Sequence, residues 1–180
     1  MANELMSHHT NMWHVIEPDE YAVRVDPLFE LALLVKAAQR ALERMINEAL
    51  RPLGITAAQA DALVVIGAAE PVSLKDLGDL LIAEAGHPSR LVDRLVAAGL
   101  VERRAAGDDR RRVELSLTAA GRKLERRVQA ARAAVMDAGR QVVADRDLEP
   151  ALSLLRELVA TTPYGELLDR RRGLADQPPP

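Results

Sequence analysis

The apolar residues of this chain recur mostly at helical spacing, and the first clear run covers residues 26–50. Leucine, valine, methionine and isoleucine return there every three or four positions, which predicts an amphipathic helix. Asp26 and Pro27 match a helix start, because a carboxylate caps free N–H groups and proline fits the first turn. Pro52 and Gly54 mark the end of this helix.

Two shorter helices are predicted next. Thr56 and Gln59 have the spacing of a capping box, in which each side chain binds the backbone N–H of the other residue. They open a helix that runs to about Gly67. Ser73 caps a third helix, in which the leucines at positions 74, 77, 80 and 81 are the expected buried side chains.

The pattern changes between residues 85 and 121, where a short helix leads into two strands. Pro88 suits the first turn of a fourth helix, and Gly99 is placed to end that helix in the left-handed conformation. A strand then begins at Leu100, and residues 113–117 alternate between apolar and polar, which predicts a half-exposed strand. A helix, a glycine stop and a two-stranded hairpin in this order predict a winged helix-turn-helix, a DNA-binding motif.

Heptad-like apolar spacing follows Thr118, which caps a fifth helix running to about Val143. A sixth helix shows the same spacing from Leu148 to Val159, Pro163 interrupts it, and a short helix is expected at Tyr164–Arg172. Helices with such seams pack against other helices, and a two-fold homodimer supplies the partner surface.

We therefore predict a mainly α fold with a small β-hairpin wing. The predicted parts are a partly ordered N-terminal arm (1–25), an N-terminal dimerisation helix (26–52), a winged helix-turn-helix DNA-binding domain (53–117), C-terminal dimerisation helices (118–172) and a disordered tail (173–180).

Composition narrows the possible chemistry. The chain has no cysteine, which excludes disulfides and thiolate metal sites, and its aromatic content of 2% favours an aliphatic ligand pocket. No segment approaches the roughly 18 continuous apolar residues of a membrane span, and no signal peptide is visible. We therefore expect a cytoplasmic protein that does not enter a membrane.

The charge distribution favours nucleic acid as a partner, although the net charge is −3. Residues 85–112 carry seven arginines against four acidic residues, which gives this segment a local net charge of +3. Local concentration of positive charge matters more for phosphate contact than the total charge does.

The central segment 78–124 closely resembles the MarR family of bacterial transcription regulators, and the correspondence extends over about residues 28–160. The resemblance is carried by RLVDRL at 90–95, AAGLVERR at 97–104, DRR at 109–111 followed six residues later by LT at 117–118, and LGITAAQADAL at 53–63. It implies a homodimer with interlocked terminal helices that binds a pseudo-palindrome in double-stranded DNA. It also implies repression, less often activation, and release by a small lipophilic or phenolic acid bound between the dimer helices and the DNA-binding lobe.

Four residues of the fourth helix are candidates for DNA contact: His87, Ser89, Arg90 and Arg94. The N-terminal residues of a recognition helix point at the groove floor, and arginines four positions apart share one face and can each reach guanine O6 and N7. Asp93 is expected to orient an arginine, because phosphates repel it. Two other interpretations remain: these are solvated polar positions, and His87 is a capping or solvent-facing residue.

The stretch 86–89, Gly-His-Pro-Ser, differs from the Ser-Thr-Val-Thr type of sequence with which the family often begins this helix. The operator sequence therefore cannot be taken from relatives.

The predicted hairpin turn carries three further candidates, Arg110, Arg111 and Arg112. The resemblance makes Arg111 the residue for the minor groove, and Asp109 is placed to brace its guanidinium. Arg110 and Arg112 are predicted to be phosphate contacts or exposed side chains.

Other classes of function are less well supported. His8, His9 and His14 have a spacing that fits no common metal site, so we predict neither a metal nor a cofactor. No phosphate-binding loop, nucleophile elbow or HExxH motif is present, which argues against an enzyme. Two alternatives stay open, a winged-helix protein-interaction module that does not bind DNA and a constitutive regulator without a ligand.

Overall fold

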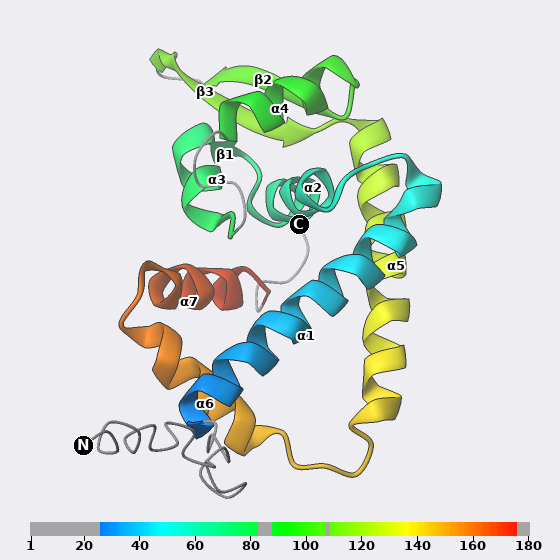
Figure 1. The fold of residues 1–180 in the computed structure, drawn as a ribbon. Helices are drawn as coiled ribbons and strands as arrows, with labels where there is room; N and C mark the ends of the chain where they lie inside the picture. The colour runs from blue at the N-terminus through cyan, green and yellow to red at the C-terminus, as the bar shows by residue number, and fades with distance from the viewer. Residues whose placement is uncertain (1–25, 83–87, 107–108, 176–180) are drawn as a thin grey trace, which may run out of the picture. The chain divides into compact units, whose positions relative to one another are not determined.

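The computed structural model describes residues 26–82, 88–106 and 109–175, and the fold is mainly helical with one small sheet, as predicted (Figure 1). In chain order the elements are α1 (Pro27–Leu50), the 3-10 helix η2 (Arg51–Leu53), α2 (Ala57–Ala69), β1 (Val72–Ser73), α3 (Leu74–Leu80), α4 (Pro88–Ala97), β2 (Val101–Ala106), β3 (Asp109–Leu117), α5 (Ala119–Val142), α6 (Glu149–Ala160) and α7 (Pro163–Ala175).

The chain divides into two units, residues 1–40 and residues 41–180. In the first unit the structure describes residues 26–40, which hold the N-terminal part of α1. The predicted cap is present, since the Asp26 carboxylate accepts a hydrogen bond from the N–H of Leu28 at 2.9 Å. The arm predicted for residues 1–25 lies outside the described residues.

Helix ends in the second unit follow the sequence signals. The Thr56 hydroxyl accepts a hydrogen bond from the N–H of Gln59 at 3.2 Å, and the Gln59 side chain accepts one from the N–H of Thr56 at 3.0 Å. The Ser73 hydroxyl accepts from the N–H of Asp76 at 3.1 Å and starts α3. Gly99 has φ of +68°, which confirms the left-handed end expected after α4.

The sheet has three antiparallel strands in the order β1-β3-β2. The hairpin β2–β3 was predicted, and Val101 pairs with Leu117 at its base. The strand β1, whose Val72 pairs with Leu115, was not predicted. Two residues are too few to show the alternation that reveals a strand.

The main core of this unit lies between the sheet and helices α2, α3 and α4. Burying one leucine, isoleucine or valine side chain contributes about 1.5–3 kcal/mol, so the buried side chains of this core hold together the lobe that the sheet forms with α2, α3 and α4. Val113, which the alternation predicts to be buried, is 44% exposed, and it pairs with Ala105 toward the free end of the hairpin. The fully buried side chains of the core include Leu63, Ile66, Leu77, Val92, Leu95, Val101, Leu115 and Leu117.

The start of α5 is joined directly to the end of α4 by Thr118. The Thr118 hydroxyl accepts a hydrogen bond from the N–H of Gly121 at 3.0 Å and donates one to the carbonyl oxygen of Gly99 at 2.7 Å. A second apolar cluster, formed by Leu50, Ala60 and Val128, holds α5 against α2. The lobe and the long helix are therefore packed together.

We expect Gly121→Ala to lower the free energy of unfolding by about 1–3 kcal/mol, as overpacking does. A Cβ at position 121 would lie 2.0 Å from the carbonyl oxygen of Leu100, and backbone cannot move aside cheaply. Urea denaturation measures the change. The matched control is Gly139→Ala on the same helix, where nothing lies within 4 Å and alanine should stabilise by up to about 1 kcal/mol. Equal effects at the two positions would contradict the argument.

The C-terminal boundary differs from the prediction. The tail was expected to start at residue 173, whereas α7 continues to Ala175. Leu174 packs against the main core, so apolar burial extends the helix past the predicted end. Residues 176–180 lie outside the described part of the chain.

Within the described residues, no single helix is long and apolar enough to cross a membrane. Only a bent pair, residues 27–53 with 57–69, reaches the required length and composition jointly.

Candidate nucleic-acid interface

Helix α4 has one buried and one exposed face. Leu91, Val92 and Leu95 point into the core, while Ser89 and Arg90 are exposed. The apolar residues recur every three or four positions, so the polar residues between them face outward. Burial of one face leaves the other free to meet a ligand.

Arg90 and Arg94 both lie on the exposed face of α4, as predicted. Neither forms an ion pair with another residue in the described part of the chain. Their guanidinium N–H donors are therefore available to an external acceptor. Two such groups four residues apart can reach neighbouring base edges or phosphates.

Asp93 binds an arginine, which confirms the role predicted for it. Its Oδ1 lies 2.6 Å from Nη2 of Arg103, so the pair joins α4 to strand β2. Both side chains keep substantial exposure, and the pair therefore orients the guanidinium more than it stabilises the fold. The next residue, Arg104, pairs with Glu102 at 2.8 Å.

Arg103 is the functional candidate that sequence reasoning missed. Its place beside α4 depends on the register of β2, in which Arg103 lies opposite Leu115 of β3. The sequence contains only a weak signal for it, an arginine ten residues after Asp93. Arg103 places a guanidinium, held by Asp93, beside the exposed face of α4.

The remaining candidates are His87 and the residues at the turn end of the hairpin. His87 lies outside the described residues. Residues 109–112 belong to the backbone of β3, and Ala106 pairs with Asp109 where β2 and β3 approach the turn. Their side chains are outside the described part of the structure, so the roles of Arg110, Arg111 and Arg112, and the bracing by Asp109, stay predictions.

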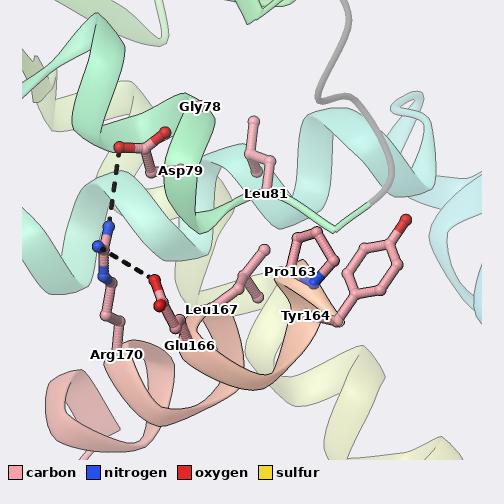
Figure 2. Close-up of a pocket in the computed structure, with 8 residues that line it drawn as sticks. All are labelled: Gly78, Asp79, Leu81, Pro163, Tyr164, Glu166, Leu167 and Arg170. Carbon is pink, nitrogen blue, oxygen red and sulfur yellow. Dashed lines mark ion pairs between the residues drawn. The ribbon is translucent and has the colours of Figure 1, made fainter. Parts of the chain in front are cut away.

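A pocket of about 480 Å³ lies between α3 and α7 (Figure 2). Its apolar side is formed by Leu81, Pro163 and Leu167, and Tyr164 stands at its edge. At its other end Arg170 lies 3.7 Å from Asp79. The ligand site that the family resemblance implies, between the dimer helices and the DNA-binding lobe, stays a prediction.

No cluster of three or more His, Cys, Asp or Glu side chains that could hold a metal ion is found among the described residues. The three histidines of the arm lie outside those residues.

Residues 53–112, which include α4 and most of the wing, match the family model described as MarR family. Over this segment the chain is similar to the MarR family. Over 94 residues it is 36% identical to the multiple antibiotic resistance protein MarR of Escherichia coli (strain K12), a match that covers 52% of this chain and 65% of that protein. The matched segment therefore spans just under two thirds of the length of this MarR relative.

A longer match within the family joins the chain to the organic hydroperoxide resistance transcriptional regulator of Bacillus subtilis (strain 168). It is 26% identical over 132 residues and covers 73% of this chain and 88% of that regulator. Among solved structures, a mutant MarR from E. coli complexed with operator DNA superposes with a TM-score of 0.61 at 28% identity, covering 74% of this chain and 94% of that chain. The MarR fold thus extends well beyond the segment that the family model matches.

Proposed function

We propose that this protein is a transcription regulator, a repressor that binds a pseudo-palindromic site in double-stranded DNA as a homodimer. The observation that carries the proposal is the exposed face of α4, where Arg90 and Arg94 have no described partner. The guanidinium of Arg103, held by Asp93, lies beside this face. Support comes from the MarR relative, which was solved with operator DNA. Such a regulator acts in the cytoplasm and has no enzymatic activity.

In this proposal residues 53–117 form the DNA-binding domain, while residues 26–52 and 118–172 serve dimerisation. Exposed apolar side chains on the terminal helices support the dimer. Leu28, Phe29 and Leu34 of α1 are each more than half exposed, and leucines along α6 are exposed as well. Apolar side chains gathered on a surface helix mark a contact surface, and a second copy of the chain is the simplest partner.

We expect the double substitution Leu155→Glu with Leu158→Glu to weaken dimerisation at least about 100-fold, because two charges would be buried in an apolar interface. Sedimentation equilibrium measures the dissociation constant. The matched control is Ser153→Glu, which adds the same charge to α6 at a polar position. If the double variant has the same dimer dissociation constant as wild type, α6 is not part of the interface.

DNA binding is tested by selecting bound sequences from random double-stranded DNA. A two-fold symmetric consensus, with half-sites about one helical turn apart, is the expected result for a dimeric helix-turn-helix protein. The competing function, a protein-interaction module, predicts no enriched sequence. It also predicts an affinity for DNA that does not fall with salt, whereas each phosphate contact contributes about 0.9 to the salt slope.

Release by a small lipophilic or phenolic acid is part of the proposal and rests on the family resemblance. A library of aromatic acids should contain compounds that raise the thermal midpoint and release the selected DNA. If no compound does both, the protein is a constitutive regulator.

A further inference from the structure

One carboxylate in the second unit binds two arginines that come from two different helices. Asp61 lies on α2, and its Oδ1 is 2.8 Å from Nη2 of Arg171 on α7 and 3.2 Å from Nη2 of Arg132 on α5. All three side chains are only about a quarter exposed or less. The Asp61 cluster, formed by these three residues, therefore joins the DNA-binding lobe to two helices that follow it in the chain.

Because the Asp61 cluster is partly buried, its charges depend on one another for stabilisation. Two guanidinium groups share one carboxylate, and Nε of Arg132 is buried without a hydrogen-bond partner. Removing the Asp61 carboxylate would leave two partly buried positive charges unpaired and close to each other. The loss of one partner from a buried charge cluster is much more costly than the loss of an exposed pair.

Helix α7 is attached to the lobe at other points as well. Leu167 is buried, Leu174 packs against the main core, and Arg170 pairs with Asp79 of α3 at 3.7 Å (Figure 2). Figure 1 shows α7 lying along the side of the lobe formed by α2 and α3. The same helix follows α6 closely, since the Cβ position of Gly165 lies 3.1 Å from the Cα of Ala160.

We infer that Asp61 is a positioning residue that fixes the DNA-binding lobe on α5 and α7, and thereby sets the separation of the two recognition helices in the dimer. The inference rests on the proposed function and adds to it a specific determinant of half-site spacing. Adjacent base pairs lie about 3.4 Å apart along DNA, so a lobe that is held rigidly accepts one spacing. A loosely held lobe would accept several spacings with similar affinity.

The chain offers closely matched variants for the test. Asp61→Asn removes the shared charge, and Arg171→Gln removes the contact from α7 while leaving Arg132 paired. The control is Arg172→Gln, since Arg172 is adjacent on α7, is more exposed and pairs with Asp169 of the same helix. Asp61→Glu keeps the charge and serves as the conservative rescue.

The first readout is the affinity for the selected operator and for versions with two base pairs added or removed between half-sites. Wild type and Arg172→Gln should prefer the original spacing by at least about tenfold. Asp61→Asn and Arg171→Gln should reduce this preference to about threefold or less, with unchanged affinity for a single half-site and an unchanged salt slope. Asp61→Glu should restore most of the preference.

The second readout does not depend on DNA or on dimerisation. Because the chain has no cysteine, Ala97→Cys on α4 and Gly173→Cys on α7 give a single pair of spin labels on exposed positions that spans the contact between the lobe and α7. Labelled protein is diluted with unlabelled protein so that the distances are intramolecular. The distance distribution should be narrow in wild type and Arg172→Gln and broad in Asp61→Asn and Arg171→Gln.

The outcomes separate the two proposals. If the wild-type protein selects no DNA but the label distances change as predicted in the variants, the proposed regulator function is wrong and the positioning role of Asp61 stands. If Arg171→Gln and Asp61→Asn fold but change neither the label distances nor the spacing preference, the positioning role of Asp61 is wrong and the proposed regulator function stands. If Asp61→Asn does not fold, Arg171→Gln decides.

Discussion

Replacing Arg90 or Arg94 by alanine should lower the affinity for operator DNA about 10- to 100-fold. Both guanidinium groups lie on the exposed face of α4 and have no ion-pair partner among the described residues. A guanidinium that donates two hydrogen bonds to guanine contributes about 1–3 kcal/mol of discrimination, and 1.4 kcal/mol corresponds to a factor of ten in affinity. The loss is measured by fluorescence anisotropy with the selected operator at fixed salt.

The form of the loss distinguishes base contact from phosphate contact. A base contact predicts that the variants lose affinity for the operator more than for random DNA, whereas a phosphate contact predicts a uniform loss and a salt slope smaller by about 0.9. The control is Arg140→Ala in the last turn of α5, where the arginine pairs with Asp137 of the same helix. If both α4 variants bind the operator as tightly as this control does, α4 is not the recognition helix.

Leu95→Ala should lower the free energy of unfolding by about 2–5 kcal/mol, the range for a fully buried leucine. Leu95 is 0% exposed and anchors α4 to the core of the lobe. The truncation opens a cavity beneath the recognition helix, so stability and operator affinity should fall together. Urea denaturation gives the first quantity.

The control for Leu95→Ala is the same kind of truncation at Val113 on β3, which is 44% exposed. Val113→Ala should cost less than about 1 kcal/mol, because most of its surface already meets water. Similar losses for Leu95→Ala and Val113→Ala would mean that α4 is not anchored through Leu95.

The helices of this fold could be predicted from local signals. The capping box at Thr56 and the glycine stop at Gly99 each involve residues close together in the sequence, and the structure confirms both. The exposed face of α4 follows from the same short-range periodicity, so Arg90 and Arg94 were correctly placed on the surface.

The contacts that could not be predicted join residues far apart in the chain. Arg171 and Asp61 are separated by 110 positions, and no local pattern connects them. Arg103 reaches Asp93 only because β2 folds back beside α4. Such pairs depend on strand register and helix packing, which are set by the whole core and not by neighbouring residues.

The hydrogen bonds of Thr118 also limit where this chain can be lengthened. The hydroxyl of Thr118 reaches the carbonyl oxygen of Gly99, and its N–H reaches the carbonyl oxygen of Leu100, so three elements meet without slack. An inserted residue there would misplace the end of α4, the sheet and α5 at once. Within the described residues, the exposed connection 144–147 between α5 and α6 is held only by local hydrogen bonds, from the N–H of Arg146 to the carbonyl oxygen of Val143 and from the N–H of Glu149 to the Asp147 carboxylate, so added residues or a tag belong there.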